Sequence, residues 1–383
     1  MKIAVNTRLL LKNKLEGIGR FTCESLRRIV SAHPEHTFYF IFDRNYDEQF
    51  IFADNVIPII TFPPTRHPYL WYFYFEYSIP YVLKKINADL FFSPDGWLSL
   101  RTDIPQIAVI HDLNFEHYTD FLRPSHQKYY TTYFPQFAHK AARLATVSEY
   151  SKKDICEVYH IPIEKIDVVY NGSNNQFAPV SPEKKLDIRV RYALGYEYFL
   201  FVSAIHKRKN LANMLAAFDA FKTATQSDMQ FLIVGERAGL QGDVQQVYEH
   251  MQHITSVHFL GYLSQKELCE VMAAAKALVY VSFFEGFGIP IVEAFSAETA
   301  VITSTTTAMP EIAGDAALLV NPFSVEDIQQ AMTNIAQDEQ LRNTLIEKGK
   351  LRRNLFTWDH TASLLWDCIE KVIATMADTN PYS

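Results

Sequence analysis

The chain has 383 residues, 48% of them hydrophobic and 21% charged; this ordinary balance excludes collagen-like and disordered chains, and the length predicts two domains. Its 36 Lys and Arg against 43 Asp and Glu give a formal net charge of −7, which argues against a general nucleic-acid-binding protein. The four cysteines are widely separated, so the sequence predicts neither a disulfide framework nor a metal site and fits a reducing compartment.

In the first half of the chain, short apolar runs alternate with helical or polar segments. Strands are predicted over residues 3–5, 38–42, 90–92, 107–110 and 143–147. After the first strand comes a loop with Gly17 and Gly19, and then a helix predicted from Phe21 to Val30. This order of strand, glycine loop and helix opens a parallel α/β domain. Apolar runs without polar interruption are typical of strands buried on both faces.

The character of the chain changes near Asn171, where turn-forming residues gather and prolines and charges follow. Residues 179–196 are therefore predicted to be a linker between two Rossmann-type domains, 1–178 and 197–358. In the second domain, strands are predicted over 198–203, 230–234, 257–260, 277–281 and 300–304, with helices over 210–223, 243–252, 265–275 and 290–297. A last helix is predicted from Trp358 to Ala377. Because ligands of parallel sheets bind beyond the carboxyl ends of the strands, the function is expected in those loops, in a cleft between the domains.

The strongest pattern is a glycine loop over residues 282–294, between a predicted strand and a helix. Gly286 and Gly288 have no Cβ and let the backbone approach a ligand closely. Pro290 suits the first turn of a helix, so the amides of Gly288 and Ile289 can point at an anion. An ordinary glycine turn remains an open alternative.

Two carboxylates in this segment, Glu285 and Glu293, invite comparison with a glycosidase pair. Such pairs are separated by about 5–5.5 Å in retaining glycosidases and about 6.5–9.5 Å in inverting ones. Because Glu285 lies in a loop and Glu293 inside the next helix, we expect them to hold different parts of one elongated ligand.

A basic turn, His206–Asn210, follows the first strand of the second domain. Arg208 offers a planar fork for phosphate and Lys209 a point charge. A solvated basic turn without a ligand is the alternative.

In the first domain, Gly17 and Gly19 are a weaker candidate for a close approach to a diphosphate. His111 follows the predicted strand 107–110; it could contact a sugar or transfer a proton, and it could equally be a structural histidine. The sequence has no Asp-X-Asp pair, phosphate-binding P-loop, nucleophile elbow or zinc spacing. No metal site is therefore predicted, and neutralising a diphosphate falls to Arg208, Lys209 and backbone amides.

Together these loops resemble the retaining GT-B glycosyltransferases of family four, which use nucleotide-sugar donors. In the second half the resemblance is carried by R-K-N-L (208–211), F-L-G-Y-L-S (259–264), E-G-F-G-I-P-I-V-E (285–293) and M-P-E-I-A-G-D-A-A-L-L-V-N-P (309–322). In the first half, and at the end of the chain, it is carried by E-G-I-G-R-F (16–21), V-I-H-D-L (109–113), T-V-S-E-Y-S (146–151), V-V-Y-N-G (168–172) and F-T-W-D-H-T-A (356–362).

The resemblance implies a GT-B fold, with two Rossmann-like domains facing each other across a cleft. Residues 1–178 would bind the acceptor and residues 197–358 the nucleotide-sugar donor. The helix within residues 359–383 would return to the N-terminal domain.

The resemblance also implies roles for the candidate residues. Glu293 would bind ribose hydroxyls and Glu285 would lie near the donor sugar. Arg208 and Lys209 would neutralise the diphosphate, and Gly17 and Gly19 would approach it from the other domain. The backbone of Phe287, Gly288 and Ile289 would hold sugar hydroxyls and phosphate. Main chain near Gly261 and Tyr262 would hold the base, and His111 would face the transferred sugar.

The expected function is that of a retaining, metal-independent hexosyltransferase without a cofactor. The donor is predicted to be GDP-mannose and the acceptor a glycan or lipid-linked glycan of surface polysaccharide synthesis. A nucleotide-sugar epimerase and a non-catalytic nucleotide-sugar or glycan binder are the alternatives. An NAD dehydrogenase is a remote one, because the loop with Gly17 and Gly19 lacks the third glycine of the dinucleotide-binding fingerprint.

The expected location is cytoplasmic. The first residues are too polar for a secretory signal, and no stretch approaches the ~18–20 apolar residues of a membrane span. The aromatic segment Arg66–Phe75 suggests a peripheral contact at the inner face of the membrane; a buried aromatic helix is its alternative.

Overall fold

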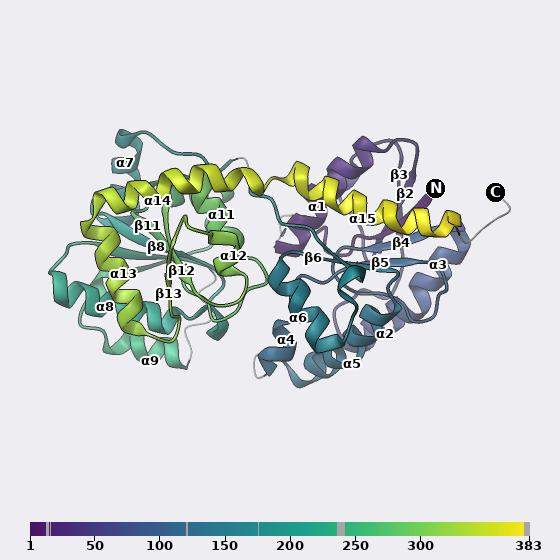
Figure 1. The fold of residues 1–383 in the computed structure, drawn as a ribbon, viewed down its shortest axis with the longest axis horizontal. Coiled ribbons are helices and arrows are strands. Elements are labelled where there is room, and N and C mark those ends of the chain that lie inside the picture. Colours follow the sequence, from purple (N-terminus) through teal and green to yellow (C-terminus); the bar gives the residue numbers. More distant parts are fainter. Residues whose placement is uncertain (13–14, 16, 120–121, 175, 236–241, 379–383) are drawn as a thin grey trace. The chain divides into compact units, whose positions relative to one another are not determined.

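The computed structural model describes residues 1–12, 15, 17–119, 122–174, 176–235 and 242–378. The chain divides into two compact units, Met1–Gly172 with Trp358–Ser383 and Ser173–Thr357. Each unit is built around one parallel sheet (Figure 1). The cleft expected between the units stays a prediction.

The first unit contains a seven-stranded sheet in the order β3-β2-β1-β4-β5-β6-β7. Neighbouring side chains of β1 enter different cores: Ile3 and Val5 pack on one face of the sheet and Ala4 on the other. The strands are β1 (Lys2–Asn6), β2 (Thr37–Phe42), β3 (Val56–Ile60), β4 (Leu90–Ser93), β5 (Gln106–Val109), β6 (Arg143–Thr146) and β7 (Ile166–Val168).

All five predicted strands of this unit are present, but the sequence analysis missed β3 and β7. Both are edge strands. β3 contains Pro58, which weakens the strand pattern and is tolerated at an edge, and β7 has only three residues.

Helices cover both faces of the first sheet. On one face α1 (Gly17–Ala32) packs beside α15 (Trp358–Asp378), and α15 contributes Trp358, Leu365 and Ile369 to that core. The return of the C-terminal helix to the N-terminal unit is therefore confirmed. The helices of the opposite face are α2 (Pro68–Phe73), the π-helical turn η2 (Tyr74–Ser78), α3 (Ile79–Ile86), α4 (Asn114–His117), α5 (Pro124–Lys140) and α6 (Glu149–Tyr159); the 3₁₀ turns η1 (Glu48–Phe50) and η4 (Ile163–Lys165) complete the unit.

The predicted glycine loop before the first helix is wrong in one respect, because Gly17 and Gly19 already belong to the first turn of α1. A Cβ at Gly19 would lie 2.7 Å from the carbonyl oxygen of Leu9, so packing against backbone requires glycine there. A Cβ at Gly17 would have no neighbour within 4 Å. Glu16, the first residue of the E-G-I-G-R-F segment, lies outside the described residues.

The second unit contains a six-stranded sheet in the order β10-β9-β8-β11-β12-β13. Its strands are β8 (Tyr198–Val202), β9 (Gln230–Val234), β10 (Val257–Gly261), β11 (Ala277–Tyr280), β12 (Ala300–Ser304) and β13 (Leu318–Val320). The five predicted strands are again present. The missed strand, β13, is a three-residue edge strand. The three strands that the sequence analysis missed, β3, β7 and β13, therefore all lie at a sheet edge.

The helices of the second unit surround its sheet, with α8 (Leu211–Thr225) beside α13 (Val325–Gln337) over one core. The others are α7 (Pro182–Ala193), α9 (Asp243–His250), α10 (Gln265–Ala274), α11 (Ile289–Ser296), α12 (Met309–Ala313) and α14 (Glu339–Arg352), with 3₁₀ turns η5 (Lys207–Lys209), η7 (Ile254–Ser256) and η8 (Arg353–Leu355). No helix in the described ranges is both long and apolar enough to cross a membrane.

The linker predicted over residues 179–196 is wrong, since most of it forms helix α7. Ser181 caps this helix through its side chain and Pro182 occupies its first turn, two features that favour a helix start. The helix packs beside α10 and belongs to the second unit. The proline and charges that predicted a linker thus belong to a helix: Pro182 begins it, and the charged residues lie on its exposed face.

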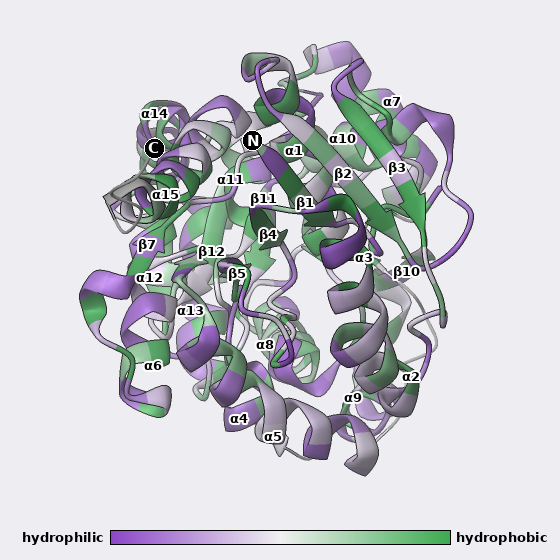
Figure 2. Cartoon of the chain, turned by 90° about the vertical axis from the view of Figure 1, so that its right-hand side faces the viewer, coloured by the Kyte–Doolittle hydropathy of each residue, from purple (hydrophilic) through white to green (hydrophobic). Residues whose placement is uncertain are grey.

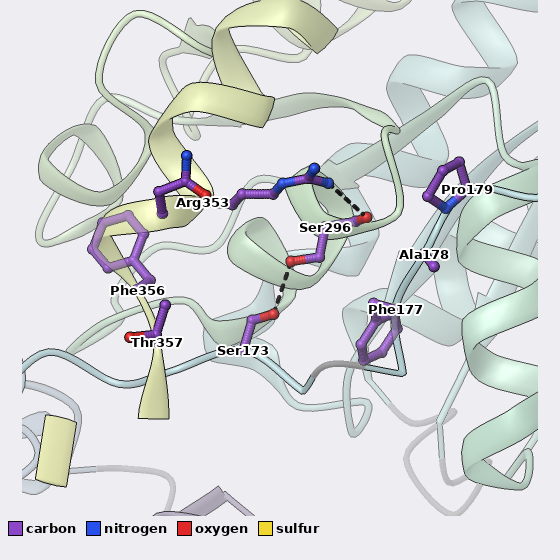
Figure 3. Close-up of a pocket in the computed structure, with 9 residues that line it drawn as sticks. Ser173, Phe177, Ala178, Pro179, Ser296, Arg353, Phe356 and Thr357 are labelled. Atoms are coloured by element: carbon purple, nitrogen blue, oxygen red, sulfur yellow. Dashed lines mark hydrogen bonds between the residues drawn. The ribbon is translucent and has the colours of Figure 1, made fainter. Parts of the chain in front are cut away.

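The chain passes between the units at Gly172–Ser173 and again at Thr357–Trp358. On the side of the second unit, the Ser173 amide donates to the Phe356 carbonyl at 3.1 Å, and the Ser173 and Ser296 hydroxyls lie 2.8 Å apart. Arg353 also reaches the Ser296 carbonyl, at the edge of a 390 Å³ pocket (Figure 3). The two segments that lead between the units are therefore hydrogen-bonded to one another and to α11.

Candidate active site

In each sheet the chain order reverses at one place, between β1 and β4 in the first and between β8 and β11 in the second. Loops at such a switch point form the usual ligand crevice of an open α/β sheet. The basic turn at Arg208 and Lys209 follows β8, and the glycine loop follows β11. Two segments about 75 residues apart in sequence therefore meet at one end of the second sheet.

A buried ionic cluster joins these two loops. Lys209 Nζ lies 2.6 Å from Glu285 Oε1, and Arg208 Nη1 lies 2.9 Å from Glu285 Oε2. Arg208 Nη1 also donates to the carbonyl of Phe284, and the Phe283 amide donates to the Arg208 carbonyl. The two cations and one carboxylate leave a net charge of +1 in the cluster.

Three residues that the sequence analysis did not select hold this cluster in place. Tyr280 donates its hydroxyl hydrogen to Glu285 Oε1 at 2.8 Å, and Lys209 Nζ lies 3.2 Å from the same hydroxyl. The Asn210 amide donates to the carbonyls of Val281 and Pro322. Thr307 accepts from the Glu285 amide at 3.1 Å. Asn210 stood within R-K-N-L, but nothing in the spacing identified its partners.

The electrostatics of the cluster favour an ionised Glu285. Burial opposes the charged form, but the neighbouring charges of Lys209 and Arg208 and their hydrogen bonds prevail and hold the pKa of Glu285 at about 2. The Glu285 side chain is therefore a carboxylate at neutral pH. Burial, followed by the charges of Arg208 and Lys209, lowers the pKa of His206.

Lys207 lies outside the ionic cluster although it shares the same turn. Its side chain is 66% exposed, and its Nζ lies 3.6 Å from Asp243. Only two of the three cations in this basic turn therefore reach the loop after β11.

The glycine loop enters α11 through Gly288, which has a φ of +101°. Because a Cβ there would lie 3.0 Å from Ile291 and the backbone is left-handed, glycine is required for conformation as well as for space. Ile289 begins the helix, Phe287 is buried against Phe356 with ring centroids 5.6 Å apart, and Glu293 is buried on α11.

The segment expected to bind the base lies at the end of β10, on the other side of β8 in the sheet. Gly261 has a φ of +70° with open space where a Cβ would be, and Tyr262 is 88% exposed. The Gly261 carbonyl accepts from Gly235, whose own Cβ would collide with the Ser203 carbonyl. The backbone at Gly261 is therefore uncovered, and its role toward a base stays a prediction.

The first unit has its own cavity, of 530 Å³, at the switch point of its sheet. Its lining combines aromatic rings with polar groups. The sequence analysis had named His111 as a candidate site residue and had singled out the aromatic segment that contains Trp71, but it had not selected the other lining residues. The lining includes Trp71, Trp97, Phe115, Tyr130, Asp112 and Asn114.

An ion pair forms part of this cavity wall. Arg8 follows β1 and Asp95 follows β4, and Arg8 Nε lies 2.6 Å from Asp95 Oδ2 with both side chains buried. The Asn6 amide donates to Asp95 Oδ1 at 2.8 Å, and the guanidinium lies 4.4 Å from the centroid of the Trp97 ring. Asp95 therefore neutralises the Arg8 charge and aligns it with the aromatic wall.

His111 follows β5 and lines the same cavity. Its Nε2 lies 2.9 Å from the carbonyl of Pro94; because a carbonyl only accepts, Nε2 carries the hydrogen and Nδ1 is the acceptor of the neutral ring. Burial lowers the pKa of His111, against the effect of that hydrogen bond. The Phe21 ring, from α1, packs edge-on against the imidazole at 4.9 Å between centroids.

The structure thus brings Arg208, Lys209 and Glu285 together, with Phe287, Gly288, Ile289 and Glu293 on the same loop and helix. Within the described ranges, no three His, Cys, Asp or Glu side chains are grouped so as to hold a metal ion.

Two family models match the chain. Residues 184–352 match the model described as glycosyl transferases group 1, and residues 15–177 match the model described as glycosyltransferase family 4. The chain belongs to the group 1 glycosyltransferases. The family resemblance drawn from the sequence motifs is confirmed.

Individual relatives support the same membership of the glycosyltransferases. O-antigen chain mannosyltransferase B of Escherichia coli is 24% identical over 362 residues, which cover 91% of this chain and 94% of that protein. O-antigen chain mannosyltransferase RfbU of Salmonella typhimurium is 29% identical over 299 residues, covering 76% and 79%. Among solved structures, Anabaena HepE in complex with UDP-glucose matches with a TM-score of 0.71 and 16% identity, covering 99% of this chain and 100% of that one. The expected glycosyltransferase fold of two Rossmann-like domains is confirmed.

Proposed function

We propose that this glycosyltransferase transfers mannose from GDP-mannose, with retention of anomeric configuration and without a metal ion, to a glycan or lipid-linked glycan during surface polysaccharide synthesis. The observation that carries the transfer chemistry is the buried cluster of Arg208, Lys209 and Glu285 at the switch point of the second unit. The mannose donor rests on the two relatives named as O-antigen mannosyltransferases.

The cluster fits a reaction in which a diphosphate leaves. As the bond between the sugar and the phosphate lengthens, negative charge grows on the leaving group. Arg208 and Lys209 are fixed in advance, so they stabilise that charge more than they stabilise the bound donor. The amides of Gly288 and Ile289 at the start of α11 add donors to the same anion. A donor phosphate oxygen on the same face of the sugar deprotonates the acceptor hydroxyl in this proposal.

Glu285 takes a positioning role in this proposal. Both of its oxygens already accept from Lys209, Tyr280 and Arg208. A carboxylate with a pKa of about 2 and two bound cations is a poor nucleophile and a poor proton acceptor. It orients the cations toward the diphosphate, while Glu293 binds the ribose and backbone near Gly261 and Tyr262 binds the base.

The cavity of the first unit is the proposed acceptor site. Trp71 and Tyr130 bring aromatic rings, which commonly pack on sugars, to its wall, and Asp112 and Asn114 offer polar atoms for hydroxyl groups. Because Arg8 is neutralised by Asp95, this wall suits an uncharged sugar better than a phosphorylated one.

The test supplies purified full-length protein with GDP-mannose and mannose-containing oligosaccharides, and follows GDP release and product formation. We expect transfer that requires an acceptor, persists in excess EDTA and gives an α-linked product by NMR. Conversion of the donor without acceptor would identify an epimerase instead, and binding without turnover would identify a non-catalytic binder.

The donor is tested separately by thermal shift with GDP-mannose, UDP-glucose and UDP-galactose. A ligand present at 100 times its dissociation constant adds about 2.7 kcal/mol of stability. We expect this shift with GDP-mannose; stabilisation by a UDP-sugar alone would overturn the donor and leave the transferase reaction standing.

A further inference from the structure

An exposed row of aromatic side chains runs along one helical segment of the first unit. Tyr69, Phe73, Tyr77 and Tyr81 follow one another at intervals of four residues and are 47–75% exposed. They lie on α2, η2 and α3, which continue directly into one another with helical backbone at both junctions. We call these four residues the aromatic row.

The π-helical turn η2 explains why the row stays on one side. In an α-helix, residues four apart drift around the axis, because 3.6 residues complete a turn. Hydrogen bonds from i to i+5 add a residue to one turn, which slows the rotation between Phe73 and Tyr77. The opposite side of the same helix is buried, with Trp71 lining the cavity and Tyr74 and Phe75 in the core. The sequence segment Arg66–Phe75 is therefore neither wholly buried nor wholly exposed.

The sequence segment that carries the aromatic row is basic, although the whole chain is acidic. Between residues 56 and 88 the sequence has a single acidic residue, Glu76, which is buried and accepts from the Leu100 amide. The basic residues of the same stretch are exposed: Arg66, His67, Lys84 and Lys85. Basic groups thus stand at both ends of the row.

Two further contacts are made to the rings themselves, one by a guanidinium and one by an imidazole. The Arg101 guanidinium lies 4.4 Å from the centroid of the Tyr77 ring, and the His67 imidazole stacks on Tyr69 at 5.2 Å. Next to the row, Ser78 donates to the carbonyl of Phe62, another exposed aromatic residue. The edge strand β3, which precedes this segment in the chain, is mostly green in Figure 2, and its Ile57 and Ile60 are exposed.

We propose that the aromatic row and its basic flanks dock this protein on the surface of a bilayer that contains anionic phospholipid. Tyrosine and phenylalanine rings settle at the level of lipid headgroups, and lysine and arginine attract anionic lipid. A narrow row on a convex helix, with basic residues at its ends, fits a flat anionic surface better than the concave pocket of a protein partner. Docking itself does not depend on the proposed donor or acceptor.

Docking has a consequence for the acceptor, which does rest on the proposed function. The helix that presents the row also carries Trp71 into the acceptor cavity. A membrane-bound protein would therefore hold that cavity within one helix diameter of the lipid surface, where a lipid-linked glycan is found.

The experiment measures binding of the full chain to vesicles by flotation. We expect binding to vesicles of phosphatidylcholine with 30% phosphatidylglycerol, weakened by salt, and little binding to phosphatidylcholine alone. The triple variant Tyr69→Ser, Phe73→Ser, Tyr81→Ser should bind at least tenfold more weakly. The matched control replaces three exposed apolar residues of the second unit, Leu186→Ser, Val190→Ser and Leu351→Ser, and should bind like the wild type.

Depth is measured with Tyr69→Trp and brominated lipid. The four natural tryptophans are all buried, so quenching in this variant and not in the wild type would report the row at the membrane. The proposal would be overturned if the triple variant and the wild type bound vesicles equally, or if the wild type did not bind anionic vesicles. It would also be overturned if the triple variant lost self-association without a change in lipid binding. Transfer to a soluble oligosaccharide should persist in the triple variant, which separates this proposal from the proposed function.

Discussion

Lys209 Nζ lies 2.6 Å from Glu285 Oε1, although 76 residues separate the two in sequence. The contact fixes the end of a long, flexible side chain in a buried place. A lysine held in this way does not need to reorganise when charge develops on a leaving group. The Glu285 carboxylate therefore positions the Lys209 ammonium group. Removing Lys209 should mainly slow the reaction, whereas removing the charge of Glu285 should mainly destabilise the fold.

Replacing Lys209 with alanine should slow sugar transfer by about 100–1,000-fold, equivalent to about 2.7–4 kcal/mol of transition-state stabilisation. The same range is expected for Arg208→Ala. The measurement is kcat for GDP release with a saturating acceptor. Lys207→Ala is the matched control, because Lys207 shares the turn but is exposed and faces Asp243. Equal rates for Lys209→Ala and Lys207→Ala would contradict the leaving-group role.

Replacing Glu285 with glutamine should lower the unfolding free energy at pH 7 by about 3–5 kcal/mol, because two buried cations lose their counter-charge. The pKa of Glu285 is about 2 in the folded protein and about 4.3 in an unfolded chain. Its contribution is therefore complete above about pH 5 and is lost as the pH falls toward 2. Urea unfolding at several pH values should show the wild type and Glu285→Gln converging in acid. A difference that stays constant from pH 7 to pH 3 would contradict the ionic role.

The two glycines at the start of α1 should respond differently to alanine. Gly19→Ala should destabilise the protein by about 1–3 kcal/mol, because the new Cβ would lie 2.7 Å from the Leu9 carbonyl oxygen. Gly17→Ala meets no atom within 4 Å and should stabilise it by about 0.4–1 kcal/mol. If the backbone at Gly17 approaches the diphosphate, this stable variant should still bind GDP-mannose more weakly. Urea unfolding and donor titration of both variants separate the two effects, and unchanged donor affinity in Gly17→Ala would remove Gly17 from the site.

His111 should impose an acid limit on the transfer rate. Burial lowers its pKa, so the ring is neutral at pH 7 and its Nδ1 can accept a hydrogen bond. Protonation below that pKa removes the acceptor, so kcat/KM should fall on the acid side, at a pH below the usual pKa of a histidine. His111→Gln should lose about tenfold at pH 7, the equivalent of about 1.4 kcal/mol for one hydrogen bond, and should lack this acid limit. An acid limit that survives in His111→Gln would assign it to another group.

The sequence predicted the inner strands of both sheets because those strands are apolar on both faces, as the neighbours Ile3 and Ala4 illustrate. Edge strands have no such requirement. A proline is tolerated in β3, and three residues suffice in β13, so neither produces a pattern that stands apart from a loop. Helix α7 was mistaken for a linker because its buried stripe is thin, with Ile188 and Ala193 its fully buried members.

For the candidate site, spacing identified the loops but not the contacts within them. The sequence placed Arg208, Lys209 and Glu285 at strand ends, which was enough to expect them near one ligand. It could not show that Glu285 binds the two cations, since that depends on the three-dimensional register of β8 and β11. Arg8 and Asp95 were missed although each follows a strand, because a lone charge in a short loop is ordinary until its burial is known.

Helix α15 gives the two units an order of assembly during synthesis. It supplies Trp358, Leu365 and Ile369 to the core of the unit that the ribosome makes first. Until α15 is made, that unit keeps one apolar face only partly covered, by α1, while residues 173–357 emerge and fold. A chain that ends before residue 358 should therefore attract chaperones through its first unit, even where residues 173–357 can fold.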